Sequence, residues 1–248
     1  MLQTGQGSPQ VPGRPGGRLR PLDAFSGSLA NRTYLSLREA ILTLALRPGE
    51  ALRKGEVCDA LGVSRSPVAE AVARLAGEGL VEVVPQSGTY VARFSLDEIR
   101  EGAFLREAIE LAAIDAVAAT ISDAQLVELR RNLRVQEALV ADGDVAGFYR
   151  LDAEMHALIL SFTGFRRLAQ VADTAWVHVN RARQLTLPMP GRVAQTLEDH
   201  RAVLAALEAR DGPAARAAMQ RHLRRLVAFL EPLEGSHPEL FAPRAAQR

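Results

Sequence analysis

One acid and three histidines, residue types that ligate metal ions, interrupt apolar helical patterns in the second half of the chain: Asp152, His156, His200 and His222. Asp152, His200 and His222 each recur with apolar residues at intervals of three or four, the spacing that places side chains on one helix face. Asp152, for example, follows Phe148 by four residues, and His156 lies one turn further on. These polar side chains are therefore expected to point into an apolar helical core.

The chemistry that suits such a buried set is metal binding. A buried ionised carboxylate costs several kcal/mol unless it is paired, and each buried imidazole also needs a partner. A single inward histidine is usually satisfied by a core hydrogen bond, but one divalent cation would satisfy all four groups. Asp152 and His156 would chelate from one helix, and His200 and His222 would close the site, leaving open positions for a ligand. The donor set favours zinc, with nickel or manganese as alternatives.

The elements that must position these residues are helices. From residue 94 to 232 the sequence predicts about six of them, followed by a flexible tail over 233–248. Two starts, at Ser95 and Ser122, have the capping-box pattern, in which a serine and the residue three positions later satisfy each other's free amides. Further starts are marked at Asp144, Pro190-Gly191 and Asp211-Gly212-Pro213.

The first half of the chain has a different pattern. Residues 28–93 predict three helices, over 34–46, 54–61 and from Ser66-Pro67 onward, and then two β-rich runs, 80–85 and 89–92, around a glycine-containing turn. Three helices followed by a hairpin describe a winged helix-turn-helix. Residues 1–27 carry repeated Gly and Pro with little apolar content, which predicts a disordered arm. The fold class expected is mainly α.

Composition places few limits on function. The chain has 248 residues, 48% of them hydrophobic, and a formal net charge of +1, so any basic surface must be local. Cys58 is the only cysteine, which excludes an internal disulfide. No apolar run is long enough for a membrane helix, and the start lacks a signal pattern. We therefore expect a cytoplasmic protein with no membrane partner.

The run Leu61-Gly-Val-Ser-Arg-Ser-Pro-Val-Ala-Glu-Ala-Val-Ala-Arg-Leu75, with a Gly88-Thr-Tyr-Val91 wing, resembles the GntR family of bacterial regulators over about sixty residues. The N-terminal end of such a third helix fits the DNA major groove and reads base edges. Two positions depart from the family pattern: Ala69 replaces a second arginine, and Gly55 replaces a residue that is often basic. The sequence preference therefore does not follow from the resemblance.

The residues expected to contact DNA differ in their tasks. Arg65 is expected to pair with guanine, since a guanidinium can donate two hydrogen bonds to its major-groove edge. The others are Ser64 and Ser66 beside it, Arg53, Lys54 and Arg74 for phosphates, and Gln86 and Gly88 at the wing tip, either for the minor groove or as a plain hairpin turn.

The region from about 97 to 230 resembles the FCD effector domain of the FadR subfamily, in which an Asp-x-x-x-His pair and two later histidines bind metal. The resemblance implies a small carboxylate effector beside that metal. Arg106 and Glu110 match the first helix of that domain, and Arg106 would pair either with the effector or within the bundle. His178, on a later helix, would touch the effector or lie at the rim.

Together these features predict a homodimeric transcriptional repressor that binds double-stranded operator DNA and responds to a small carboxylic acid. Two alternatives remain open. A three-histidine, one-carboxylate site could activate water in a metal-dependent enzyme, but no dedicated general base accompanies it. The helical domain could instead only dimerise the winged helices in an architectural protein, against which the buried polar set argues. We expect a regulator and not an enzyme.

Overall fold

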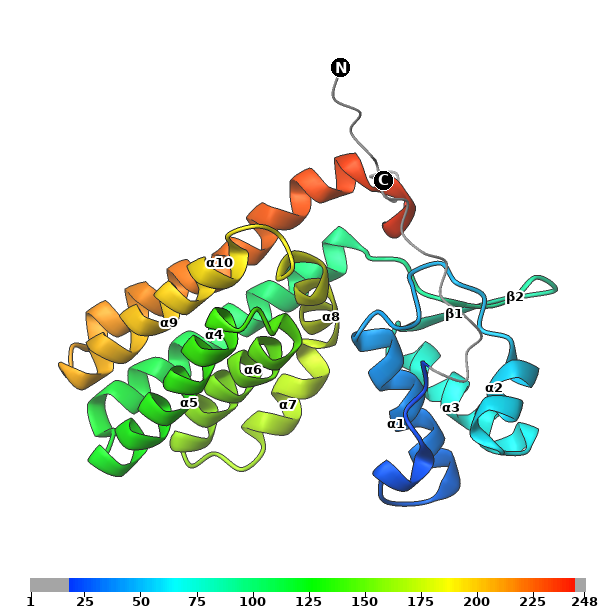
Figure 1. Ribbon diagram of the computed structural model, residues 1–248, viewed down its shortest axis with the longest axis horizontal. Coiled ribbons are helices and arrows are strands. Elements are labelled where there is room, and N and C mark those ends of the chain that lie inside the picture. Colours follow the sequence, from blue (N-terminus) through cyan, green and yellow to red (C-terminus); the bar gives the residue numbers. More distant parts are fainter. Residues whose placement is uncertain (1–17, 244–248) are drawn as a thin grey trace. The chain divides into compact units, whose positions relative to one another are not determined.

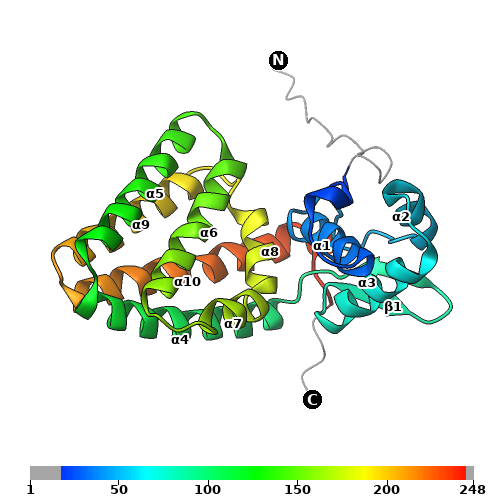
Figure 2. The same cartoon turned by 90° about the horizontal axis from the view of Figure 1, so that it is seen from below.

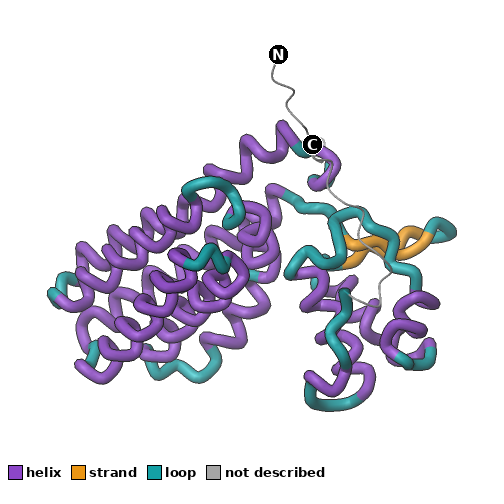
Figure 3. Tube along the Cα trace, in the orientation of Figure 1, coloured by secondary structure: helices purple, strands orange, loops and turns teal. Residues whose placement is uncertain are grey.

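The computed structural model describes residues 18–243, and the side chains of all of these except 169, 170 and 173. The chain forms two compact units, Met1–Ala92 and Arg93–Arg248 (Figure 1). Strands are confined to the first unit among the described residues, and the second unit is helical (Figure 3). No helix in the described part is long and apolar enough to cross a bilayer.

The first unit is a winged helix-turn-helix, as the sequence predicts. It comprises a 3-10 turn η2 (Leu22–Ala24), helices α1 (Leu29–Leu42), α2 (Lys54–Leu61) and α3 (Arg65–Gly77), and strands β1 (Val81–Val84) and β2 (Gly88–Val91). The strands are antiparallel, with Val81 opposite Val91, and Ala51 forms a bridge to Tyr90 beside them. The core is apolar and includes Leu37, Ile41, Val68, Leu75 and Leu80.

Local chemistry explains where these helices begin and end. Ser28 accepts a hydrogen bond from the Asn31 amide, so α1 begins five residues earlier than the apolar pattern predicts. Gly62 ends α2 in the left-handed conformation, at φ 64°. Helix α3 begins at Arg65 and not after Ser66. Pro67 therefore lies in the first turn, where backbone amides have no intrahelical acceptor, so its missing N–H costs no hydrogen bond.

Part of the predicted disordered arm, 1–27, contacts the first unit. Residues 1–17 lie outside the described part of the chain. From Arg18 onward the segment packs against the first unit: Arg18 forms an ion pair with Glu50 at 2.6 Å, and Leu19 is buried. A buried leucine and a paired arginine supply the contacts that the Gly/Pro-rich composition alone does not suggest.

The second unit comprises seven helices within the described residues. They are α4 (Leu96–Thr120), α5 (Asp123–Ala141), α6 (Val145–Phe162), α7 (Leu168–Ala175), α8 (Val177–Thr186), α9 (Arg192–Glu208) and α10 (Gly212–Ser236), followed by η3 (Pro238–Leu240). Helices α7 and α8 adjoin at Trp176, so the expectation of about six helical segments holds.

Helix caps and an apolar core hold this unit together. Ser122 and Gln125 form the reciprocal capping box at the start of α5, and Asp144 and Asp211 cap α6 and α10. Helix α10 packs along both α4 and α9, and α5 packs on α6 and α9 (Figure 2). The core between them includes Ile114, Leu129, Phe148, Ile159 and Leu207. Helices α6, α9 and α10 thus face a common interior.

The tail predicted to be flexible, 233–248, is ordered as far as residue 243, and residues 244–248 lie outside the described part. Helix α10 continues through Pro232 to Ser236. Beyond it Phe241 is buried against Phe94, with ring centroids 5.8 Å apart. Pro232 removes one hydrogen-bond donor from the helix. The chain is nevertheless anchored before the proline by buried Leu230 and after it by buried Phe241.

Candidate functional site

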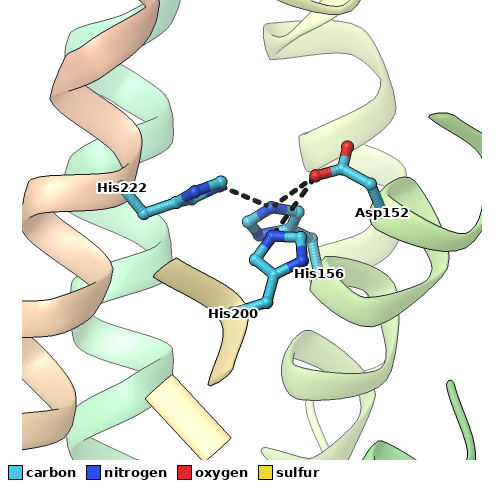
Figure 4. A group of neighbouring side chains, drawn as sticks. All are labelled: Asp152, His156, His200 and His222. Carbon is cyan, nitrogen blue, oxygen red and sulfur yellow. Dashed lines mark hydrogen bonds and ion pairs between the residues drawn. The ribbon is translucent and has the colours of Figure 1, made fainter. Parts of the chain in front are cut away.

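Asp152, His156, His200 and His222 meet in the interior of the helical unit (Figure 4). Helix α6 supplies Asp152 and His156, α9 supplies His200, and α10 supplies His222. One ligand atom of each residue lies within 4.8 Å of the others, and all four residues are at least 95% buried. The structure therefore brings together the complete set predicted from the sequence.

The imidazole Nε2 atoms point toward the centre of the cluster. His200 Nε2 lies 3.3 Å from Asp152 Oδ1, and His156 Nε2 lies 3.9 Å from the same oxygen. His156 Nε2 and His222 Nε2 are 3.1 Å apart. Three ring nitrogens and one carboxylate oxygen thus converge on one small volume.

Each histidine turns its other nitrogen toward an outer polar partner. Nδ1 of His156 is 2.5 Å from Glu110 Oε2, and Nδ1 of His200 is 2.8 Å from Gln136 Oε1. His222 Nδ1 is 3.8 Å from Asp199 Oδ2. Such outer partners fix the tautomer and ring orientation of metal-binding histidines.

The hydrogen bonds around His200 determine which of its nitrogens carries the proton. The Gln136 side-chain amide donates to Asn132 Oδ1 at 2.6 Å, which leaves Gln136 Oε1 as an acceptor toward the ring. His200 must therefore carry its proton on Nδ1 and present the Nε2 lone pair to the cluster. Glu110, an acceptor when ionised, fixes His156 in the same way.

The electrostatics of the cluster keep the imidazoles neutral. Burial holds the pKa of His200 and of His222 well below the ordinary histidine value, and neighbouring histidines lower it further. Burial alone would raise the pKa of Glu110, but Arg106 and His156 outweigh it and hold that pKa far below its usual range. Neutral histidines beside an ionised outer acid are the protonation states that metal ligation requires.

These residues fit a divalent metal ion. Within the described part of the chain, Asp152 Oδ1 and His200 Nε2 form no hydrogen bond, although both atoms are buried. His156 and His200 present lone pairs to the same space as the Asp152 carboxylate. Buried acceptors that face one another without a donor are costly, and a cation at their centre satisfies them together. The cluster can therefore hold a metal.

A cavity of about 190 Å³ borders the cluster. Its polar lining includes His156, Arg106, Trp176, Asn180 and Arg183. Arg106 Nε donates to Glu110 at 2.6 Å, so the pairing within the bundle that the sequence left open does form. Arg183 contacts Asp152 Oδ2, and burial lowers its pKa to about 9, with Arg106 adding to the effect.

His178, for which the sequence left effector contact and a rim position open, is not among the described residues that line this cavity. Its Nδ1 lies 3.7 Å from Glu98. Helix α8 turns Asn180 and Arg183, three residues apart, toward the cavity, and a residue two positions before Asn180 falls on another side of the helix. Arg183, which the sequence did not single out, lines the cavity from the same helix.

Sequence reasoning missed three buried polar residues around the cluster: Gln136, Asp199 and Arg183. The sequence pattern did indicate Gln136, because this polar residue interrupts the apolar face of α5 formed by Leu129 and Leu133. The clustered histidines interrupt the apolar faces of their own helices in the same way. Asp199 is 2% exposed and adjoins His200 in the chain. Arg183 gives no such signal, because its burial depends on which face of α8 turns inward.

The residues predicted to contact DNA include three exposed groups in the first unit. Ser64, Arg65 and Ser66 are exposed at the start of α3, and Gln86 and Gly88 are exposed at the turn between the strands. Lys54 is exposed at the start of α2, beside Arg53, which forms an ion pair with Glu56 at 2.9 Å.

Arg74, predicted to contact a phosphate, also packs between two helices of the first unit. Its guanidinium lies over the Tyr34 ring at 3.5 Å and donates to Asn31 Oδ1 at 3.1 Å. Nε also lies 3.6 Å from Glu78. These contacts tie α3 to α1, so the structure gives Arg74 a packing role that the sequence did not predict.

A winged helix-turn-helix followed by a helical unit with a buried cluster that can hold a metal is the architecture of a DNA-binding transcriptional regulator. Comparison with known proteins agrees: residues 29–91 match the family described as bacterial regulatory proteins, gntR family, and residues 101–225 match the FCD domain. The chain belongs to the GntR family and carries the FCD domain of its FadR-like subfamily. The predicted family is confirmed.

Its relatives are transcriptional regulators and not enzymes. The chain is 39% identical to an uncharacterized HTH-type transcriptional regulator in an unstable DNA locus of Streptomyces ambofaciens, over 86% of this chain and 89% of that protein. It is 30% identical to the HTH-type transcriptional repressor RspR of Escherichia coli K12, over 84% and 92%. The structure of E. coli McbR/YncC shares the fold, with a TM-score of 0.71 and 22% identity over 84% and 99%.

Proposed function

We propose that this chain is a repressor whose affinity for DNA changes when a small carboxylic acid binds at a metal ion in the helical unit. The observation that supports this most directly is the cavity beside the cluster, because His156 lines it together with two buried arginines, Arg106 and Arg183. A cation site and guanidinium groups that face one cavity suit an organic anion.

A divalent ion held by Asp152, His156, His200 and His222 would supply positive charge and open coordination positions for a carboxylate oxygen. Zinc suits the donor set best, with nickel and manganese as alternatives. The chain's own residues prepare the site: Glu110 and Gln136 fix the rings of His156 and His200, and Arg183 contacts the outer oxygen of Asp152.

On the DNA side, we propose that a homodimer binds a pseudo-palindromic operator, with one α3 helix in the major groove of each half-site. Ser64, Arg65 and Ser66 would face base edges, and Arg53 and Lys54 would contact phosphates. The repressor among the relatives supports repression as the outcome. Since its proposed target is the bacterial chromosome, the protein would act in the cytoplasm.

Helix α4 offers a covalent route between the two activities. It carries Arg106 and Glu110 and begins at Leu96, after the short segment that follows β2. A shift of α4 on effector binding would therefore move the segment that leads to the wing. Coupling of this kind typically amounts to about 1–3 kcal/mol and must be reciprocal between effector and DNA.

The test is operator affinity with and without a panel of small carboxylic acids, in metal-loaded and in chelated full-length protein. Acids are expected to weaken operator binding about 5- to 150-fold in the metal-loaded protein and to have little effect after chelation. His222→Ala should lose metal, measured by elemental analysis, and lose the acid response. Its matched control is His237→Ala, an exposed histidine near the end of the same helix.

Two results would contradict the proposal. If acid responses persisted unchanged after complete metal removal with the helices intact, the histidines would only be core residues. If no acid changed operator affinity while footprinting still showed a bound dimer, the helical unit would serve dimerisation alone. A single half-site bound by a monomer would overturn the proposed dimer.

A further inference from the structure

We infer that the effector of this chain is a small dicarboxylate without an ammonium group. The inference rests on the proposed function and adds to it the chemical class of the effector. It is argued from the balance of charges around the cavity, from the hydrogen-bonding character of its lining, and from its size.

Three buried acids around the cavity are each paired with an arginine before any metal binds. Glu110 is paired with Arg106 at 2.6 Å, and Asp152 is paired with Arg183. Asp199, the third buried acid beside the histidines, lies 2.8 Å from Arg225. The three histidines are neutral. A divalent ion would therefore add two positive charges that none of these described side chains offsets.

Two uncompensated charges in a buried site favour a ligand that carries two negative charges. A monocarboxylate would leave one positive charge unpaired away from water, which is costly. A dicarboxylate would place one group at the ion and the other at the arginines. Arg192, a further buried arginine near Arg106 and Arg183, only increases the positive charge of this region.

The polar side chains of the lining offer donors to a ligand and hardly any acceptors. Arg106 Nη2 and Trp176 Nε1 are buried and have no hydrogen-bond partner in the described part of the chain. Both belong to residues that line the cavity. These donors need acceptor oxygens, which a carboxylate supplies at both ends of a diacid.

The potential acceptors on the described side chains around the cavity are already occupied. The two oxygens of Glu110 face Arg106 and His156. Asp152 faces Arg183 with one oxygen and the histidines with the other. Asn180 Oδ1 accepts from Arg183 at 3.4 Å. Among the described side chains of this lining, an ammonium group would find no free carboxylate or carbonyl, so amino acids should be rejected.

The size of the cavity limits the ligand further. Its volume is about 190 Å³, which leaves room for a small organic molecule. That space suits a short diacid. Malonate, succinate and glutarate, which differ by single methylenes, are therefore suitable probes.

The experiment compares matched ligands on metal-loaded, full-length protein by titration calorimetry and by the shift in melting temperature. Each diacid is paired with its half-amide, which keeps the shape and removes one charge. Succinate is also paired with butyrate and with aspartate, which adds the ammonium group. At least one diacid should bind about tenfold or more tightly than its half-amide, and succinate should bind more tightly than aspartate by a similar factor.

Variants connect the preference to named residues. Arg106→Gln should reduce the ratio of diacid to half-amide affinity toward one, whereas Arg201→Gln, an exposed arginine on α9, should leave it unchanged. Asn180→Asp adds the acceptor that the lining lacks, so it should weaken succinate and strengthen aspartate. This second variant changes ligand preference in a direction that loss of folding cannot imitate.

The outcomes separate this inference from the proposed function. If half-amides or monocarboxylates bind as tightly as the diacids and release DNA equally well, the proposed function stands and the dicarboxylate inference is wrong. The same holds if aspartate equals succinate. If none of the diacids binds the metal-loaded protein, the inference fails as well. If no acid of any kind alters operator affinity, the proposed function fails first.

Discussion

The candidate functional residues are exposed to solvent in the first unit and buried in the core in the second. In the first unit Arg65 and its serine neighbours are exposed, and an apolar core that includes Leu37 and Leu75 holds the fold. In the second unit Asp152 and the three clustered histidines are themselves part of the core. Substitutions of the functional residues should therefore leave stability nearly unchanged in the first unit and alter it in the second.

Metal removal should show the largest difference between the units. If free metal exceeds its dissociation constant about a thousandfold, chelation should lower the stability of the helical unit by about 4 kcal/mol. Trp176, the only tryptophan of the chain, reports unfolding of this unit by fluorescence. Amide exchange should increase over residues 96–236 and remain unchanged over 29–91. Equal increases in both units would break the comparison.

Gln136→Met should have the next largest effect, although Gln136 does not belong to the proposed ligand set. Without the oxygen that orients His200, metal affinity should fall about 10- to 100-fold. Competition with a metal chelator of known affinity measures this loss. Arg134→Met, at an exposed position of the same helix, is the control and should bind metal normally. Unaltered metal affinity in Gln136→Met would show that the outer hydrogen bond does not position the ring.

Arg65→Ala tests the exposed unit. Operator binding should weaken by about 1–3 kcal/mol, with relaxed preference at one base position, and stability should change by less than about 0.5 kcal/mol. Binding to a set of single-base operator variants measures both effects on DNA. Arg74→Ala should behave differently and lower stability, because Arg74 packs on Tyr34. Equal weakening of Arg65→Ala on every sequence would make Arg65 a phosphate contact.

Two serines at helix starts provide the smallest test. Ser122 takes part in a complete capping box, whereas the Ser64 side chain makes no capping hydrogen bond at the start of α3. Ser122→Ala should therefore cost about 1 kcal/mol, and Ser64→Ala should be nearly neutral for stability and affect only DNA binding. Urea titrations of both variants measure the difference. A stability loss in Ser64→Ala as large as that in Ser122→Ala would contradict it.

The parts of the fold that the sequence predicted are those determined locally. Caps such as Ser122 and Asp144, and glycine stops such as Gly62, act within a few residues, so the helices could be placed from the sequence. The cluster of Asp152 and three histidines was also predictable, because a polar residue at an apolar position of an amphipathic helix is expected to be buried.

What the sequence could not give depends on contacts between distant segments. The inward turn of Arg183 depends on how α8 packs, and the order of the tail depends on Phe241 meeting Phe94. Likewise Leu19 and Arg18 are held by residues far along the chain, including Glu50. No short-range sequence pattern predicts such contacts. Composition alone therefore predicted disorder for residues 18–27 and flexibility for 233–243, which instead pack against the rest of their units.

The pairing of Phe94 with the C-terminal segment has a consequence for protein engineering. The Phe94 amide donates to Leu240 O at 2.9 Å, and the Ala242 amide donates to Phe94 O at 2.8 Å, so the helical unit begins and ends at one place. Domains with adjoining ends tolerate insertion into host loops and circular permutation. Residues 93–243 are thus suited to grafting into the surface loop of a fluorescent or enzymatic reporter, where ligand binding would act on both junctions at once.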